Sequence, residues 1–199
     1  MTEKVKMPAI AWLRVTGFLS GWLFYEYGSK VQVNGRRVVC LQHLDGVREI
    51  LRMETVDDTE MSPDLPVNLS LSASRYGVIS AAMTLSPEAT ERMYHVSQEQ
   101  MLQFVPIECP RLRITQNGLL REWDGNAMFG EQQAKALLRL LRQYFWDSVE
   151  QFAIRYAQQH EDEKYAQQEM IEAFCRETNT SDIHVEAIRR EWQRRQKRK

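Results

Sequence analysis

The sequence has few of the residues that usually reveal a small protein's chemistry. Three cysteines and four histidines occur among 199 residues, and the cysteines are far apart and odd in number. This argues against a disulfide framework and fits a reducing compartment, so we expect a cytoplasmic protein. Nine glycines, six prolines and the lack of any low-complexity tract argue against wholesale disorder.

Motifs of the common enzyme and cofactor classes are also missing. The chain has no phosphate-binding glycine loop and no G-x-S-x-G nucleophile elbow. Cys40 and His43 have a ligand-like spacing, but a structural zinc site needs four ligands and no second such pair exists. We therefore expect a non-enzyme with no catalytic residue, metal site or cofactor. An active site that uses Cys40 with His43, or Cys109 with His95, is the minority hypothesis.

A long uninterrupted apolar run is the third feature that the chain lacks. Its most apolar segment, residues 7–28, is interrupted by Arg14 and closed by Glu26, whereas a transmembrane helix needs about 20 consecutive apolar residues. No small-x-small cleavage site of a signal peptide follows. Four large residues share one helical face: Trp12, Val15, Leu19 and Trp22. We predict a buried element, with an interfacial membrane helix as the alternative.

Glycine and proline are distributed unevenly along the chain. All nine glycines lie at or before Gly130, and all six prolines lie at or before Pro110. Because these residues are the main helix breakers, their absence from 131–199 predicts an all-helical C-terminal region. The composition thus divides the chain into a mixed region, 1–130, and a helical region, 131–199.

The mixed region carries the signals of antiparallel hairpins. Asn-Gly pairs at 34–35 and 117–118 each separate two β-prone runs, and Asn-Gly is the strongest short-range signal for a two-residue turn. A third hairpin is predicted around residues 75–77. Short helices are predicted to begin at Asp45, Ser86 and Ser97. The predicted fold class is α+β, with antiparallel hairpins and short helices followed by an all-helical C-terminal extension.

The helical region begins with an amphipathic pattern at steps of three or four residues, which predicts one long helix. The stripe consists of Ala134, Leu138, Leu141, Phe145, Val149, Phe152 and Tyr156. It is wide enough to pack on the sheet or on a second copy, so a homodimer is one prediction. Trp146 lies about 100° from the stripe and is expected to face a second layer, another subunit or a nucleic-acid base.

Two further helices are predicted after the long one. Met170, Ile171 and Phe174 belong to the second, and the concentration of capping residues at 178–182 separates it from the third. In the third, Val185, Ile188 and Trp192 share one face, so we expect this helix to dock on the body. The residues beyond Trp192 are expected to project.

The last helix carries the strongest charge asymmetry of the chain. From Ile183 onward seven basic residues stand against Glu186 and Glu191, a local charge of +5. Because the whole chain carries −1, residues 1–182 carry −6. The basic residues are Arg189, Arg190, Arg194, Arg195, Lys197, Arg198 and Lys199. The acidic stretch 54–64 is either a solvated loop or an internal partner of this tail.

The leading hypothesis for function is a non-enzymatic binding protein whose basic helix contacts a polyanion, most simply nucleic acid. Asp182 and Glu186 occupy the N-terminal end of that helix, where a recognition helix reads bases, so contact with phosphates is expected instead. The alternatives are an acidic protein surface as partner, an assembly module built on the long helix, or helix capping by the basic end alone. A patch continuous with hairpin arginines at 36, 37, 111 and 113 would favour nucleic acid.

Overall fold

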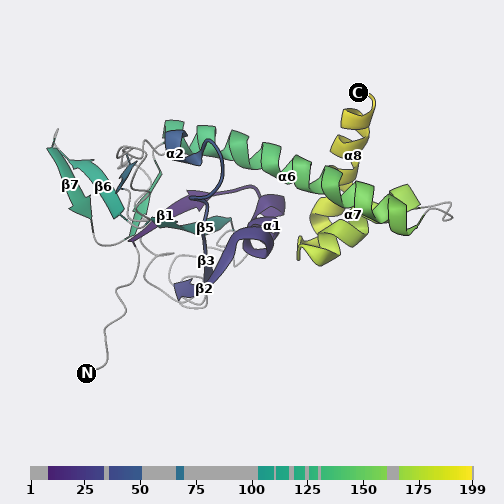
Figure 1. Cartoon of the computed structure of the whole chain (residues 1–199), viewed down its shortest axis with the longest axis horizontal. Coiled ribbons are helices and arrows are strands. Elements are labelled where there is room, and N and C mark those ends of the chain that lie inside the picture. The colour runs from purple at the N-terminus through teal and green to yellow at the C-terminus, as the bar shows by residue number, and fades with distance from the viewer. Residues whose placement is uncertain are drawn as a thin grey trace, which may run out of the picture.

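The computed structural model describes residues 9–33, 36–50, 66–69, 103–109, 111–116, 119–123, 126–129, 131–160 and 166–198. The larger of the two described β-sheets is covered on one face by helices, and the helices of residues 166–196 pack together near the C-terminus (Figure 1). The α+β class predicted from the sequence is confirmed.

Five of the described strands form the larger sheet, in the order β2-β3-β5-β1-β8. They are Ala9–Arg14 (β1), Gly28–Val33 (β2), Arg36–Val39 (β3), Phe104–Cys109 (β5) and Asn126–Met128 (β8). β1 pairs antiparallel with β5, and β2 pairs antiparallel with β3. The β3–β5 and β1–β8 pairs are parallel. The sheet is therefore mixed, and these parallel pairs were not predicted from the sequence.

Two of the three predicted hairpins are confirmed. Val33 pairs with Arg36, so the connection at 34–35 joins β2 and β3 as expected. In a smaller sheet, β6 (Arg111–Gln116) and β7 (Leu119–Trp123) meet through the Gln116–Leu119 pair. β4 (Pro66–Leu69) pairs parallel with β6. The hairpin around 75–77, the helices from Ser86 and Ser97, and the acidic stretch 54–64 lie outside the described residues.

The apolar N-terminal segment is buried as predicted, but it is not a single helix. It forms β1 and then α1 (Gly17–Tyr27), so Trp12 belongs to a strand. Alternate residues of β1 are buried on opposite faces of the sheet, with Ala11 and Leu13 in the main core and Ile10 and Trp12 in a smaller cluster. Among the described helices, none combines the length and apolar character that crossing a bilayer requires.

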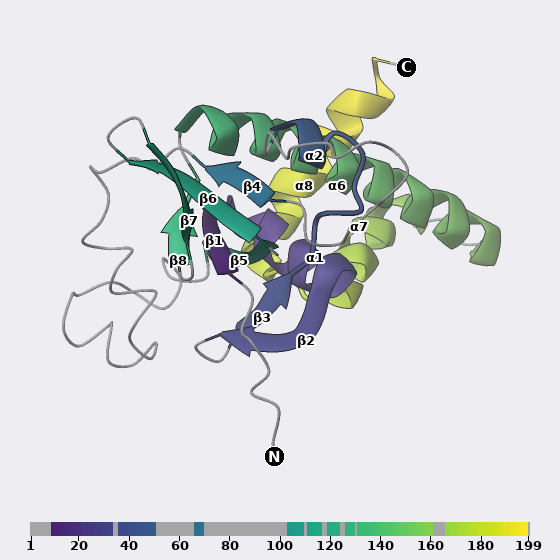
Figure 2. The ribbon, with the colours of Figure 1, turned by 60° about the vertical axis from the view of Figure 1, so that its left-hand side comes forward.

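The remaining helices are α2 (Val47–Ile50), α6 (Glu131–Gln159), α7 (Ala166–Glu177), the 3-10 helix η2 (Asp182–His184) and α8 (Val185–Gln196). They confirm the short helix near Asp45, the long amphipathic helix and the two helices after it. α8 crosses α6, and its C-terminal end extends beyond that helix (Figure 1 and Figure 2).

The connection between α7 and η2 lies in the predicted capping segment. Asn179 adopts a left-handed φ of 52°, and the Thr180 amide donates to the Cys175 carbonyl at 2.8 Å. The Asn179 amide donates to the Arg176 carbonyl at 3.3 Å, so the two bonds close α7 in a Schellman motif. The Thr178 hydroxyl also donates to the Phe174 carbonyl at 2.9 Å. These bonds hold the backbone of the connection in place.

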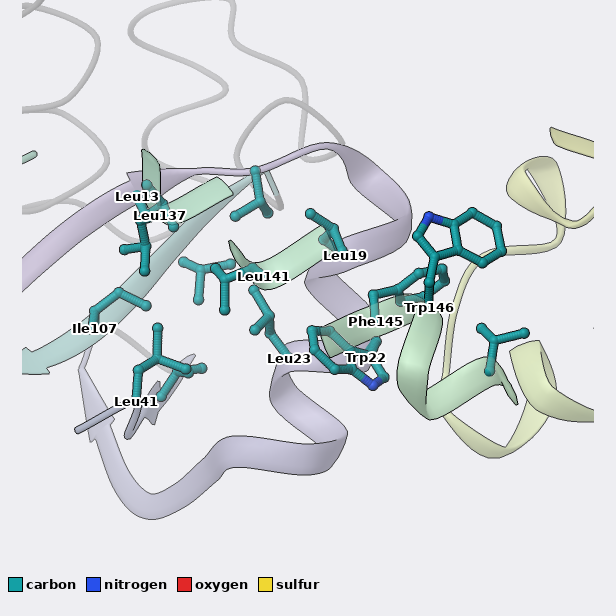
Figure 3. Close-up of a cluster of buried hydrophobic side chains, with 14 of the residues drawn as sticks. Leu13, Leu19, Trp22, Leu23, Leu41, Ile107, Leu137, Leu141, Phe145 and Trp146 are labelled. Atoms are coloured by element: carbon teal, nitrogen blue, oxygen red, sulfur yellow. The ribbon is translucent and has the colours of Figure 1, made fainter. Parts of the chain in front are cut away.

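The main core is shared by the mixed and helical regions. Figure 3 shows side chains of β1, α1 and α6 converging, with Phe145 beside Trp22 and Trp146. The Phe145 ring lies 5.0 Å from that of Phe18 and 5.5 Å from that of Trp22, and 5.7 Å from that of Phe174 on α7. The stripe of α6 is thus covered by the chain's own sheet and helices.

Candidate nucleic-acid interface

One face of α8, from Val185 to Trp192, is docked on the body of the protein, as the sequence predicted. Ile188 is 2% exposed and belongs to the main core, and Val185 and Trp192 pack against that core half-buried. The three side chains follow steps of three and four residues, so they share one face of the helix. Burial of this face holds α8 against the body.

Arg189 is used inside the protein. Its side chain is 26% exposed, and its guanidinium binds Glu172 of α7 at 2.6 Å and Glu186 at 2.9 Å. Arg190 also binds Glu186, with its Nε 3.0 Å from the carboxylate. The hydrogen bond from Arg190, followed by that from Arg189, lowers the pKa of Glu186 below its usual range. Two guanidiniums thus meet two carboxylates, and this half of α8 presents little net charge.

The C-terminal half of α8 has a different balance. Its basic end, defined as residues 194–198, contains Arg194, Arg195, Lys197 and Arg198, all exposed. Glu191 pairs with two of them, at 3.4 Å from Arg194 and 3.7 Å from Arg195. Within the described part of the chain, Lys197 and Arg198 have no ion pair. Lys199 lies outside that part.

The ion pairs of Glu191 with the basic end are exposed to solvent. The Arg194 side chain is 68% exposed and that of Arg195 is 44% exposed. Exposed ion pairs of this kind contribute about 0–1 kcal/mol, because water and salt screen them. A phosphate can therefore replace Glu191 at Arg194 with little loss.

Trp146 meets α8 in the same chain. It is 7% exposed, and the guanidinium carbon of Arg195 lies 4.6 Å from the centroid of its ring. Of the three environments predicted for Trp146, the structure shows a second layer within the chain. Sequence reasoning missed that Arg195 is this partner. The signal was present, because Ile188, Trp192 and Arg195 follow steps of four and three residues on one face.

A patch that joins the tail with the hairpin arginines, which would have favoured nucleic acid, has no support from the positions of their strands. The strands that carry Arg36, Arg37, Arg111 and Arg113 are β3 and β6, and both lie away from α8 in Figure 1.

The residues of the minority enzyme hypothesis lie in environments that suit nucleophiles poorly. The Cys40 thiol donates to Glu108 at 2.5 Å, and burial followed by this bond raises its pKa to about 12. Burial likewise raises the pKa of Cys109 to about 12. Because thiolates are the reactive species, the raised pKa values disfavour nucleophilic attack by either thiol near neutral pH. The exposed His43 packs its ring on Tyr27, whereas His95 lies outside the described residues.

Metal ligands do not gather in the part of the chain that the structure describes, where no group of three or more acidic, histidine or cysteine side chains could hold an ion. Comparisons with models of protein families, with curated proteins and with solved structures found no match to this chain.

Proposed function

We propose that this chain is a non-enzymatic intracellular protein that binds nucleic acid through the basic end of α8, without strong sequence specificity. The observation that carries the proposal is the separation of roles along one helix. Its N-terminal part is docked and charge-balanced, whereas its C-terminal end extends past α6 with four exposed cations, of which Arg194 and Arg195 pair with Glu191. A rigid support that presents cations to solvent suits contact with a phosphate backbone.

The chemistry of the contact follows from the residue types. Guanidinium groups bind phosphate oxygens with two parallel hydrogen bonds, and lysine adds a mobile point charge. Binding releases the counterions condensed on the nucleic acid, so affinity falls steeply with salt. The N-terminal end of α8 carries Glu186 and follows Asp182, and these carboxylates disfavour its insertion into a groove. Contact with the backbone is therefore favoured over reading of bases.

The assembly hypothesis has weaker support. It relied on the stripe of α6 and on Trp146 as surfaces for a second copy. Leu141 and Phe145 are fully buried in the chain's own core, and Trp146 is covered by α8. A homodimer through these residues would require the protein to open its core. The stripe therefore gives no reason to expect one.

The test compares two triple variants of the full chain. The first replaces Arg194, Lys197 and Arg198 with glutamine and leaves Arg195 on Trp146. The second replaces Lys30, Arg37 and Arg176, which are also exposed, and so removes the same charge elsewhere. Fluorescence anisotropy with a labelled duplex and a labelled single strand gives the dissociation constant over a range of salt concentrations.

We expect the first variant to lose affinity and to reduce the slope of log affinity against log salt by about 2.7 for duplex, from about 0.9 for each phosphate contact. The control variant should retain most of the wild-type slope. If the first variant binds as the wild type does, or if the wild type binds neither nucleic acid, the proposal is wrong. Contact with an acidic protein surface, or helix capping alone, would then account for the basic end.

A further inference from the structure

A second row of cations lies on the face of α6 that meets α8. Lys135, Arg139 and Arg142 precede Trp146 by eleven, seven and four residues. At 3.6 residues per turn these four positions fall within about 60° of one another around the helix. All three cations are exposed, and Arg139 and Arg142 have no ion pair with another described residue. We call these three residues the α6 row.

The α6 row ends one turn before Trp146, which meets the C-terminal end of α8. The Arg195 guanidinium lies 4.6 Å from the centroid of the Trp146 ring, so the contact joins the row to the basic end of α8. The α6 row extends about 10 Å from Lys135 to Arg142, and Trp146 lies about 6 Å further along the helix axis, at 1.5 Å per residue. No acidic residue occurs in the sequence between Lys135 and Trp146. The α6 row and the basic end of α8, which we call the two arms, therefore meet at the buried Trp146.

We infer that the α6 row and the basic end of α8 form a single interface, and that its ligand is a nucleic-acid backbone long enough to reach both arms. This inference rests on the proposed function and adds the surface and the length of the ligand. A small anion would be satisfied by one or two guanidiniums and would need no second arm. A polymer that carries a phosphate at every step can engage cations repeated along a helix.

A membrane surface matches the two arms less well. A helix that lies on a bilayer carries apolar side chains beside its cations, and these enter the lipid. The large apolar residues that are exposed in the described part of the chain are Tyr25, Val31, Ile154 and Ile183. None of them belongs to the α6 row or to the basic end, so the charge pattern favours nucleic acid.

The test adds the double variant Arg139→Gln/Arg142→Gln to the series above. Its control is Arg37→Gln/Arg176→Gln, which removes two exposed charges from β3 and α7. Binding to duplexes of about 20 base pairs should weaken roughly tenfold or more in the first variant. Its salt slope should fall by about 1.8, while the control stays near wild type. Urea unfolding midpoints that match the wild type would show that both variants are folded.

The outcomes separate this inference from the function on which it rests. If the α8 triple variant loses binding while the α6 double variant does not, the two-arm interface is wrong and the proposed function stands. If neither variant loses binding, both are wrong. Vesicles that contain phosphatidylserine provide a further comparison. Vesicle binding that is as tight as duplex binding, and equally dependent on Arg139 and Arg142, would overturn nucleic acid as the ligand.

Discussion

At the scale of single residues, burial keeps the thiols of this protein protonated. The pKa values of Cys40 and Cys109 rise to about 12 and that of Cys175 to about 11, from an ordinary value of 9.0. Burial is the largest cause in each case, because a thiolate loses hydration in an apolar environment. Cys40 is further held by its hydrogen bond to Glu108. These are the properties of structural cysteines.

The raised pKa values predict that the folded state loses stability at alkaline pH. Between about pH 9 and 12 the unfolded chain releases thiol protons that the folded chain keeps, so the free energy of unfolding falls as pH rises. Below pH 9 both states keep these protons and the effect is absent. Urea unfolding at pH 8 and pH 10 measures the loss. The variant Cys40→Ser has one ionising thiol fewer and should lose less stability, whereas equal losses would contradict this account.

The environment of Trp146 shows what a residue's position in the sequence can and cannot reveal. Its angle of about 100° from the stripe correctly places it off the main face of α6. Its partner could not be predicted by looking for apolar residues, because the group above the ring is the guanidinium of Arg195. A guanidinium can cover an indole ring through a cation–π contact, and a search for apolar residues does not detect such a partner. The α6 row was missed for the same reason, because its three residues are cations.

At the scale of elements, α1 touches the connection between α7 and η2 through a glycine. A Cβ atom placed on Gly21 would lie 2.5 Å from the backbone oxygen of Asn179 and 2.9 Å from its carbonyl carbon. The contacted atoms belong to the Schellman motif of α7, where the Thr180 amide and the Thr178 hydroxyl are both bonded. Because that backbone is held by hydrogen bonds, it has little freedom to move away.

Gly21→Ala is therefore expected to destabilise the protein, although alanine favours helix. The higher helix propensity of alanine contributes about 1 kcal/mol, and overpacking against backbone costs about 1–3 kcal/mol. We expect a net loss of roughly 1 kcal/mol in the free energy of unfolding, measured by urea denaturation. Gln158→Ala, at an exposed position of α6, serves as the control and should change stability by less than about 0.5 kcal/mol. A more stable Gly21→Ala variant would show that the connection is free to move.

Local patterns predicted some elements of the fold and not others, for a physical reason. The Asn-Gly pairs predicted two hairpins because a tight turn and its flanking strands are neighbours in the sequence. Residues 9–27 were misinterpreted because Trp12, Val15, Leu19 and Trp22 repeat at a helical period, although Trp12 lies in β1. That strand is stabilised by pairing with strands that are distant in the sequence, since Trp12 pairs with Pro106 and with Met128. Such pairing leaves no signal near the strand itself.

At the scale of the whole molecule, the mixed and helical regions depend on one another. Residues 1–130 and 131–199 differ in composition, yet Leu19 and Trp22 of α1 belong to the same core cluster as Leu137, Leu141 and Phe145 of α6. The glycine contact and the aromatic contacts of Phe145 add further links between the regions. Separation would expose the apolar faces of both, which is unfavourable by about 25 cal/mol for each Å² of apolar surface.

This shared core predicts that the protein unfolds in one cooperative transition. Far-ultraviolet circular dichroism reports the helices and near-ultraviolet circular dichroism reports aromatic packing, so their urea transitions should coincide. A fragment of residues 131–199 would leave the stripe of α6 uncovered by α1 and the sheet, and it should therefore retain some helix without a cooperative transition. If that fragment instead unfolds cooperatively on its own, the helical region is an independent domain. The basic end of α8 and the α6 row would then be carried by a unit that can bind nucleic acid without the mixed region.

Because both arms of the interface lie within residues 131–199, the same fragment also tests whether binding needs the support of the shared core. We expect its affinity for a duplex to be lower than that of the full chain, because the fragment lacks α1, whose Phe18 and Gly21 contact His184 and Asn179 just before α8.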